Sequence, residues 1–366
     1  MYLAAEAQPG YVNDAVATFR LGHPIYAVGL HPAEPVLVTG AGDDHVYLWH
    51  TQETEQPGAT FEKAQDTPVG AAFNADGTLL ASASMDGKLC IRQFPMVENE
   101  MAPLDTGSEI TWMSWHPTQD SVLLGTEEGM LWVATPHDDA FDSYYMASAS
   151  ALCGGWTPDG KATFSGHADG SVAYRMADAY TTTWCAVAAA PEKPMYAGNA
   201  VTAAAVCPDH PYVVVGCASG TCFVLRRDNG RVLKRLDEHT QSVEGIVVHS
   251  TRAGLTVVTV SVDGRAVVWN ALQDWSVRHV CRHVLEEGDG VELAAITGVR
   301  AVPTTPPRFI TTAVDGAVRL WDSLSGTLLR TWRGHLAPVL SLDVHAGHKT
   351  VITGSDDGTA RLFQWS

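Results

Sequence analysis

The sequence predicts an all-β protein built as a single eight-bladed β-propeller that is closed by its N-terminal strand. Three observations lead to this prediction: one short pattern occurs eight times, its spacing stays near 42 residues, and a spare strand pattern precedes the first copy. Such a period is typical of rings of four-stranded sheets. We expect residues 1–366 to form one domain, because no single blade can bury both of its faces alone.

Each copy of the pattern has a small residue, usually an acidic residue followed by Gly, an apolar stretch and often Trp. The acidic position is filled, in order, by Asp43, Asp86, Glu128, Asp169, Ser219, Asp263, Asp315 and Asp357. Successive positions are 43, 42, 41, 50, 44, 52 and 42 residues apart. Because Gly accepts positive φ, an Asp-Gly pair suits a hairpin turn. We therefore place each copy at a turn between two strands.

The ends of the sequence predict how the ring closes. The last copy ends at Phe363, which leaves the eighth blade without an outer strand in sequence order. A strand pattern at residues 15–19 lies before the first blade, and we expect it to pair with residues 360–363. This pairing would remove an exposed sheet edge. Deletion of residues 1–20 is then expected to destabilise the whole ring. The two long intervals are expected to form loops within residues 176–200 and 283–307.

Composition limits the partners. The net charge is −18, from 41 acidic and 23 basic residues, which disfavours nucleic acid and anionic membrane as direct partners. The charge fits a cationic partner, or solubility alone. Seven Cys without a Cys-x-x-Cys motif indicate reduced, buried thiols. No signal peptide or apolar run of about 20 residues occurs. We expect a soluble, monomeric protein of the cytoplasm, with the nucleus as a second location.

The repeats resemble WD repeats, in which His, Ser/Thr, Asp and Trp form one buried network. This resemblance implies two complete sets and one without Trp: His23, Thr39, Asp43 and Trp49; His239, Thr259, Asp263 and Trp269; and His335, Thr353 and Asp357. A hydroxyl, His and Asp could also suggest a catalytic triad. The structural interpretation is preferred because the set recurs with the period of the blades.

No motif predicts catalysis, a cofactor or a metal. The sequence lacks a phosphate-binding loop, a redox motif and a nucleophile elbow. Several of the 15 His lie at blade turns, such as His31, His116 and His249, too far apart in sequence to argue for a ligand cluster. We therefore expect a binding protein and no enzyme.

One face of the ring, here called the top face, is predicted to carry the binding site. It should be lined by the starts of the innermost strands and by the residues before each acidic turn position. The first group includes Tyr26, Thr111, Thr202, Glu244 and Leu340, and the second includes Met85, Glu127 and Asp356. Glu109, Glu127, Glu244 and Asp356 would then surround one opening. Glu286, Glu287, Asp289 and Glu292 add acidity nearby, or form a solvated loop. Focused negative charge attracts a basic partner.

Four segments resemble the family of angio-associated migratory cell protein, which includes a yeast WD-repeat chaperone dedicated to a large-subunit ribosomal protein. They are residues 110–117 (ITWMSWHP), 122–129, 278–283 and 314–335. The first is the most specific, whereas the last is shared by WD repeats in general. The resemblance implies capture of a basic segment of a nascent large-subunit ribosomal protein on the acidic top face during ribosome assembly.

Two other classes of function remain open at this stage. A generic scaffold, such as a ubiquitin-ligase substrate receptor or a signalling platform, could have a similar surface, although a phosphorylated or neutral partner needs basic or apolar residues on the top face. A propeller enzyme or metal-dependent hydrolase needs His and carboxylates that converge in the channel, where the sequence indicates mostly Gly, Ala, Thr and Leu.

Overall fold

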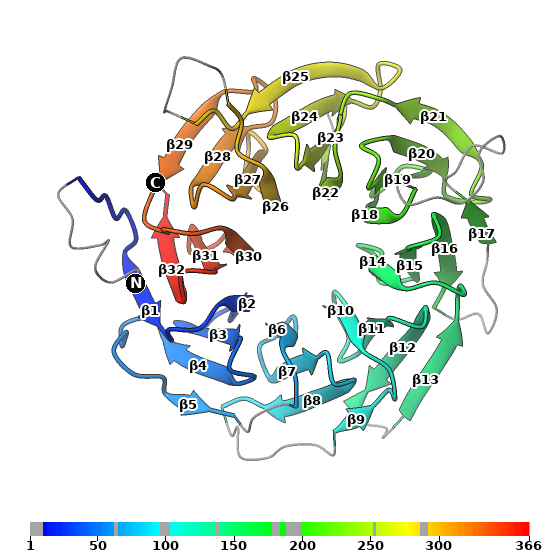
Figure 1. The fold of residues 1–366 in the computed structure, drawn as a ribbon. Coiled ribbons are helices and arrows are strands. Elements are labelled where there is room, and N and C mark those ends of the chain that lie inside the picture. Colours follow the sequence, from blue (N-terminus) through cyan, green and yellow to red (C-terminus); the bar gives the residue numbers. More distant parts are fainter. Residues whose placement is uncertain are drawn as a thin grey trace.

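The computed structural model describes residues 10–61, 65–95, 103–136, 140–177, 184–187, 199–251, 254–285 and 292–365. This part of the chain forms eight four-stranded antiparallel sheets arranged around a central channel (Figure 1). The predicted eight-bladed propeller is therefore confirmed. Within the described residues, no helix is long and apolar enough to cross a lipid bilayer.

The sheets are numbered here as blades 1 to 8 in chain order, and their strands are given from the channel outward. Blades 1 and 2 contain β2 (Ile25–Leu30), β3 (Val36–Ala41), β4 (Val46–His50) and β5 (Ala59–Thr60), then β6 (Pro68–Phe73), β7 (Leu79–Ser84), β8 (Lys88–Gln93) and β9 (Leu104–Asp105). Blades 3 and 4 contain β10 (Ile110–Trp115), β11 (Val122–Thr126), β12 (Met130–Thr135) and β13 (Ala140–Tyr145), then β14 (Ala151–Trp156), β15 (Ala162–His167), β16 (Ser171–Met176) and β17 (Trp184–Val187).

Blades 5 and 6 contain β18 (Val201–Val206), β19 (Tyr212–Cys217), β20 (Cys222–Arg226) and β21 (Val232–Leu236), then β22 (Val243–Thr251), β23 (Gly254–Ser261), β24 (Arg265–Asn270) and β25 (Ser276–Arg282). Blades 7 and 8 contain β26 (Ile296–Val302), β27 (Arg308–Ala313), β28 (Val318–Asp322) and β29 (Leu328–Trp332), then β30 (Val339–His345), β31 (Thr350–Ser355), β32 (Thr359–Gln364) and β1 (Ala17–Arg20).

The N-terminal strand closes the ring, as predicted. β1 pairs antiparallel with β32, from Ala17 opposite Leu362 to Arg20 opposite Thr359, so the strand starts two residues later than expected. Phe19 is fully buried, and its ring centroid lies 5.3 Å from that of Trp49 in blade 1. The last blade thus consists of the two ends of the chain, which meet without a covalent link.

The apolar core lies between neighbouring blades. In one cluster, for example, Phe164 of blade 4 packs with Val213 and Val215 of blade 5. The middle strands β3, β7, β11, β15, β19 and β31 are buried at almost every position. A sheet with both faces buried needs a neighbour on each side, and the ring supplies one to all eight blades.

Three turn histidines tie neighbouring blades together on the face opposite the top. The Nε2 atoms of His31, His116 and His345 lie 3.0, 3.1 and 2.6 Å from the carbonyl oxygens of Gly77, Gly160 and Pro32, each in the next blade. Their Nδ1 atoms accept amide protons of their own turns. Because Nδ1 is an acceptor, the ring proton lies on Nε2, which donates to the carbonyl of the next blade.

Phe19→Ala tests the importance of the closing strand. We expect the substitution to lower the free energy of unfolding by about 3–5 kcal/mol, because it removes a large buried side chain at the seam of the ring. Val16→Ala, one residue before the strand and exposed, is the matched control and should change stability by less than about 0.5 kcal/mol. Chemical denaturation measures both. Equal effects of the two substitutions would contradict the importance of the seam.

Candidate functional site

Every innermost strand carries a β-bulge at its second residue, on the side of the ring where these strands begin. This side is the top face. The bulge residues are Tyr26, Val69, Thr111, Leu152, Thr202, Glu244, Thr297 and Leu340. A bulge redirects a side chain out of the regular sheet alternation, so the eight residues form an inner ring around the mouth of the channel.

A second ring surrounds the first. In each blade the residue before the turn position donates its amide proton to the residue just before the innermost strand, over 2.8–3.0 Å. The donors are Gly42, Met85, Glu127, Ala168, Ala218, Val262, Val314 and Asp356. This repeated hydrogen bond fixes the backbone of the outer ring, whereas the side chains differ from blade to blade.

The four acids predicted at the mouth lie on these rings or beside them, and all four are exposed. Glu109 and Glu127 share blade 3, where the Glu127 amide donates to the Glu109 carbonyl and the Ser150 hydroxyl donates to Glu127 Oε2 over 2.7 Å. Glu244 lies on blade 6 and Asp356 on blade 8. Of the four, Glu244 lines the channel cavity, whereas Glu109, Glu127 and Asp356 lie on the top face outside that lining.

The mouth is not continuously acidic. Tyr26, Leu340 and Met85 are 41%, 38% and 37% exposed on the arc from blade 8 to blade 2. Leu152 and Val314 are further exposed apolar residues of the two rings. Sequence reasoning placed Tyr26, Met85 and Leu340 at this face and counted Tyr26 among the partner-binding residues, but it did not identify an apolar arc. The top face combines separated carboxylates with an apolar arc.

The predicted acidic loop falls largely outside the described residues. Glu286, Glu287 and Asp289 are not described, whereas Glu292 is exposed on the stem of a hairpin in which the Leu285 amide donates to the Glu292 carbonyl. Glu292 does not line the central channel.

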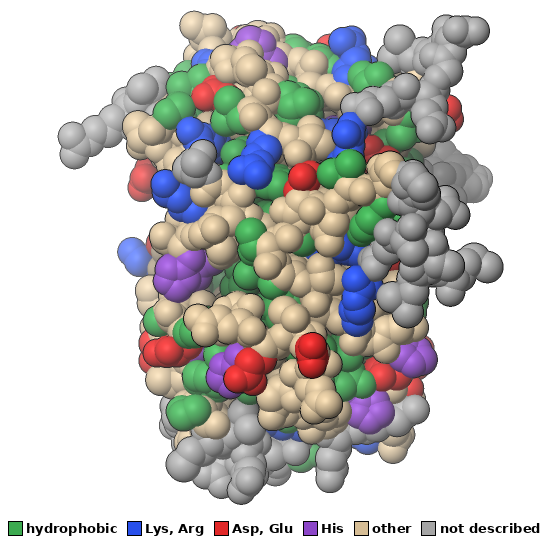
Figure 2. Space-filling view, turned by 90° about the vertical axis from the view of Figure 1, so that its left-hand side faces the viewer, with side chains coloured by type: hydrophobic (Ala, Val, Ile, Leu, Met, Phe, Trp, Pro, Cys, Tyr) green, Lys and Arg blue, Asp and Glu red, His purple; other side chains and the backbone are tan. Residues whose placement is uncertain are grey.

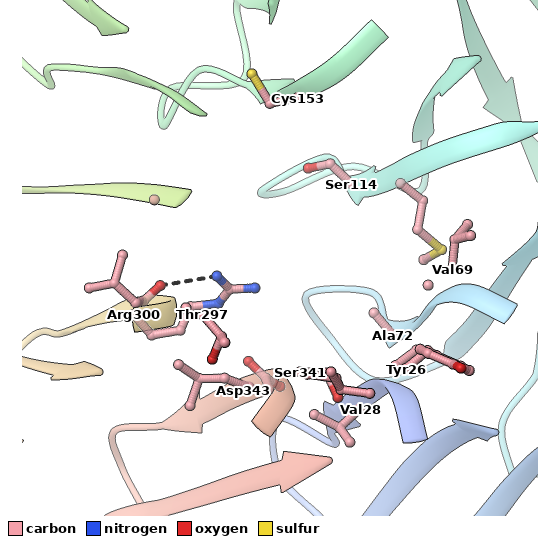
Figure 3. A pocket seen from close by; sticks show the side chains of 18 of the residues that line it. Tyr26, Val28, Val69, Ala72, Ser114, Cys153, Thr297, Arg300, Ser341 and Asp343 are labelled. Carbon is pink, nitrogen blue, oxygen red and sulfur yellow. Dashed lines mark hydrogen bonds between the residues drawn. The ribbon is translucent and has the colours of Figure 1, made fainter. Parts of the chain in front are cut away.

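The channel holds a cavity of about 610 Å³ lined by all eight innermost strands (Figure 3). Small side chains dominate its wall, as the sequence indicated, but Arg300 and Asp343 also line it. They occupy equivalent positions, each four residues after the start of its strand, in the adjacent blades 7 and 8. Arg300 donates to the Val299 carbonyl over 3.1 Å, and Asp343 accepts the Leu30 amide over 2.9 Å. Sequence reasoning did not identify Arg300 and Asp343 as channel residues. Their equivalent positions in neighbouring innermost strands could have indicated this.

The His239 set forms a buried chain of hydrogen bonds. His239 lies 3.1 Å from Asp263 through Nδ1 and 2.8 Å from Thr259 through Nε2, and Trp269 donates to Thr259 over 3.0 Å. Burial by itself would raise the pKa of the Asp263 carboxyl, but hydrogen bonds from His239 and Arg265 outweigh burial and hold this pKa well below its usual range. The side chains of His239 and Asp263 are 0% and 4% exposed, so the arrangement is sealed from substrate.

Blades 8 and 7 contain variants of this chain of hydrogen bonds. In blade 8, His335 hydrogen-bonds to Asp357 over 3.0 Å and to Thr353 over 2.8 Å. Phe363, which packs against His335, occupies the position that Trp269 has in blade 6. In blade 7, which sequence reasoning missed, His283 contacts the hydroxyl of Thr311 over 2.7 Å, and the Arg319 guanidinium lies between His283 and Asp315. Arg319 donates to His283 Nδ1, and burial followed by this positive charge lowers the pKa of His283 well below its ordinary value.

The prediction for His23 is wrong. His23 is exposed and has no hydrogen bond within the described part of the chain. Trp49 does donate to Thr39 over 3.0 Å, but the Asp43 carboxylate accepts the Tyr47 hydroxyl over 2.6 Å. Blade 1 therefore satisfies its acidic turn residue with a tyrosine of its own third strand.

Metal binding and thiol chemistry find little support in the described residues. No group of three or more His, Cys, Asp or Glu among them is arranged to hold a metal ion. Burial raises the pKa of the Cys153, Cys207, Cys217 and Cys281 thiols to about 12. Thiols with such pKa values stay protonated and unreactive near neutral pH.

Comparison with known proteins agrees with this geometry. The WD40 family (WD domain, G-beta repeat) matches residues 14–50, 55–92, 193–224 and 326–364. Parts of the chain thus match WD repeats. The chain is similar to human angio-associated migratory cell protein, with 28% identity over 371 residues that cover 96% of this chain and 80% of the relative. Ribosome assembly protein SQT1 of Saccharomyces cerevisiae is 29% identical over 114 residues, covering 30% of this chain and 26% of the relative. The resemblance inferred from the sequence is confirmed.

Solved structures share the fold of this chain. Sqt1 of Chaetomium thermophilum, crystallised bound to the N-terminus of the ribosomal protein L10, superposes with a TM-score of 0.84 at 21% identity, covering 97% of this chain and all of the other. Sqt1 of Saccharomyces cerevisiae gives a TM-score of 0.81 at 18% identity, with 96% and 99% covered.

Asp263→Ala tests the structural role of the buried sets. Loss of the carboxylate leaves His239 and the Thr240 amide without an acceptor, and we expect a cost of about 1–3 kcal/mol or more in unfolding free energy. Asp43→Ala is the matched control, because its carboxylate is partly exposed and should cost less. Thermal or chemical denaturation measures the stability of both variants. Unchanged stability of Asp263→Ala together with lost partner binding would instead assign Asp263 to the binding function.

Buried histidines predict acid sensitivity. Burial lowers the pKa of His31, His167 and His283, and that of His249 to about 4. The folded state thus holds these protons more weakly than the unfolded chain. Their contribution to stability is present above the ordinary histidine pKa of about 6.5 and is lost as the pH falls toward the folded values. For His249 the loss should approach about 3 kcal/mol at pH 4.

His249→Gln should flatten the dependence of unfolding free energy on pH between 7 and 4, whereas His50→Gln, at an exposed position, should leave it unchanged. Urea denaturation at several pH values measures the slope. The same slope in His249→Gln and wild type would rule out His249 as a source of acid sensitivity.

Proposed function

We propose that this protein is a non-enzymatic WD-repeat chaperone that captures an extended basic segment of a large-subunit ribosomal protein at the top mouth of its channel during ribosome assembly. The observation that supports the proposal is a set of exposed carboxylates on the top face: Glu244 lines the channel cavity, and Glu109, Glu127 and Asp356 lie on the same face in blades 3 and 8. Carboxylates spread in this way suit a chain that lies across the opening and offers Lys or Arg at intervals.

The relatives support the choice of partner. Sqt1 has the same fold and was crystallised with the N-terminus of ribosomal protein L10, and its yeast counterpart is named a ribosome assembly protein. A ribosomal protein segment is therefore the first ligand to test with this chain. The segment would bind before it reaches the ribosome, while its positive charge is still exposed.

Electrostatics supports fast capture. A net charge of −18 attracts a basic chain from a distance, and the exposed carboxylates then pair with its cations. Charge-assisted hydrogen bonds contribute about 1.5–3 kcal/mol each when partly desolvated, so a few of them give tight binding. Because exposed charges are screened beyond about 8 Å at physiological ionic strength, association should slow as salt rises.

The apolar arc also restricts which peptide sequences can bind. Tyr26, Leu340 and Met85 offer exposed apolar surface beside the acids, and aromatic residues at such places contribute strongly to binding. A segment that alternates basic and apolar side chains would cover both parts of the mouth. The need for both basic and apolar side chains distinguishes the proposed ligand from an arbitrary polycation.

Glu244→Lys tests the proposal. The substitution replaces attraction with repulsion and should weaken binding of a basic peptide from the N-terminus of ribosomal protein L10 by at least about tenfold, or about 1.4 kcal/mol, with a nearly unchanged melting curve. Glu34→Lys makes the same charge change at an exposed turn between β2 and β3 on the opposite face, and should have little effect. Titration of the labelled peptide at two salt concentrations measures both.

Equal affinities of wild type and Glu244→Lys, or an affinity indifferent to salt, would contradict the chaperone proposal. Either result would favour a generic interaction scaffold, such as a ubiquitin-ligase substrate receptor or a signalling platform, that uses another surface.

A further inference from the structure

A second cavity lies at the outer edge of the top face, beside blade 7. It has a volume of about 660 Å³ and is separate from the channel, and we call it the blade 7 cavity. One wall is the end of β25 with Val284, another is the β27–β28 turn at Gly316, and a third is the N-terminal segment 10–12. The Tyr11 hydroxyl donates to the Gly334 carbonyl over 2.6 Å and holds this third wall in place.

The described lining of the blade 7 cavity is basic. Arg282, Arg319 and Arg333 contribute to it, and Asp315 is the one acid among the described lining residues. Arg319 donates to both oxygens of Asp315, over 2.6 and 3.3 Å, and so neutralises it. Arg282 is exposed, and its side chain forms no hydrogen bond or ion pair within the described part of the chain. A guanidinium is therefore available to a ligand.

The remaining walls are apolar. Val12, Val284 and Leu328 line the cavity and are exposed large hydrophobic residues. Aliphatic side chains beside an open guanidinium suit a ligand that carries a carboxylate next to an apolar group. A bare inorganic anion would leave these walls uncovered.

The charge of the protein is unevenly distributed around the ring. Residues 1–225 contain 26 acidic and 7 basic residues, whereas residues 226–366 contain 15 acidic and 16 basic ones. Figure 2 shows Lys and Arg side chains gathered over its upper half, the direction in which β25, β28 and β29 lie in Figure 1. Apart from the acidic cluster of residues 286–292, an acidic ligand that approaches blades 6 and 7 therefore meets less repulsion than the net charge of −18 suggests.

We propose that the blade 7 cavity binds a short acidic peptide segment of a partner protein. A carboxylate of the segment pairs with Arg282, since a planar guanidinium presents two parallel N–H groups to a carboxylate. A neighbouring aliphatic side chain of the segment packs against Val12, Val284 and Leu328. The cavity and the mouth thus select ligands of opposite charge on the same face of the ring.

The experiment uses the full chain and a fluorescein-labelled nonapeptide of Gly and Ser with a central Glu-Leu-Glu. Fluorescence anisotropy should show saturable binding, at least about tenfold weaker for the matched peptide with Gln-Leu-Gln. Arg282→Gln should weaken binding of the acidic peptide by at least about fivefold. Arg278→Gln is the matched control, because it lies on the same strand, four residues earlier and outside the cavity lining, and should bind like wild type.

Absence of saturable binding to wild type, equal binding of the two peptides, or equal affinities of Arg282→Gln and Arg278→Gln would each overturn the inference. Melting curves of both variants should match wild type, since neither side chain is buried. Glu244→Lys should bind the acidic peptide like wild type, within about twofold, so that failure at the mouth and failure at the blade 7 cavity are distinguishable.

Discussion

A four-stranded blade with two apolar faces needs a neighbour on each side, and this constraint governs the whole molecule. Seven of the blades receive all four strands in sequence order, but the eighth combines β30, β31 and β32 with β1 from the other end of the chain. The pairing of β1 with β32 is therefore the interaction that lets every other blade bury both faces. Phe19, fully buried against Trp49 of blade 1, joins this seam to the start of the ring.

Once the ring is closed, backbone hydrogen bonds fix the same geometry in each blade. The bulge at the second residue of every innermost strand and the amide hydrogen bond from every outer-ring residue need no particular side chain. The top face can therefore vary freely in chemistry on a constant frame. Carboxylates from blades 3, 6 and 8, an apolar arc from blade 8 to blade 2, and an arginine-lined cavity at blade 7 share that frame.

Polar residues of the same kinds serve two different purposes here, and burial distinguishes them. The side chains of His239 and Asp263 are sealed and satisfied by Thr259, Thr240 and Arg265, so they stabilise the blade. Glu244 and Asp356 are exposed on the top face, and Glu244 also lines the channel cavity. A hydroxyl, an imidazole and a carboxylate in contact do not indicate catalysis when no substrate can reach them.

The sequence alone determined the blade number, the turn positions and the closing strand, because these depend on local spacing that repeats with the blades. The His239 set was implied by the resemblance to WD repeats. Tertiary structure decided the rest. His23 is exposed because Tyr47 takes up the Asp43 carboxylate, and Arg319 enters the blade 7 set between His283 and Asp315. The blade 7 cavity joins segments near residues 12, 284, 316 and 334. Such contacts depend on side-chain packing between distant segments, which spacing along the chain does not encode.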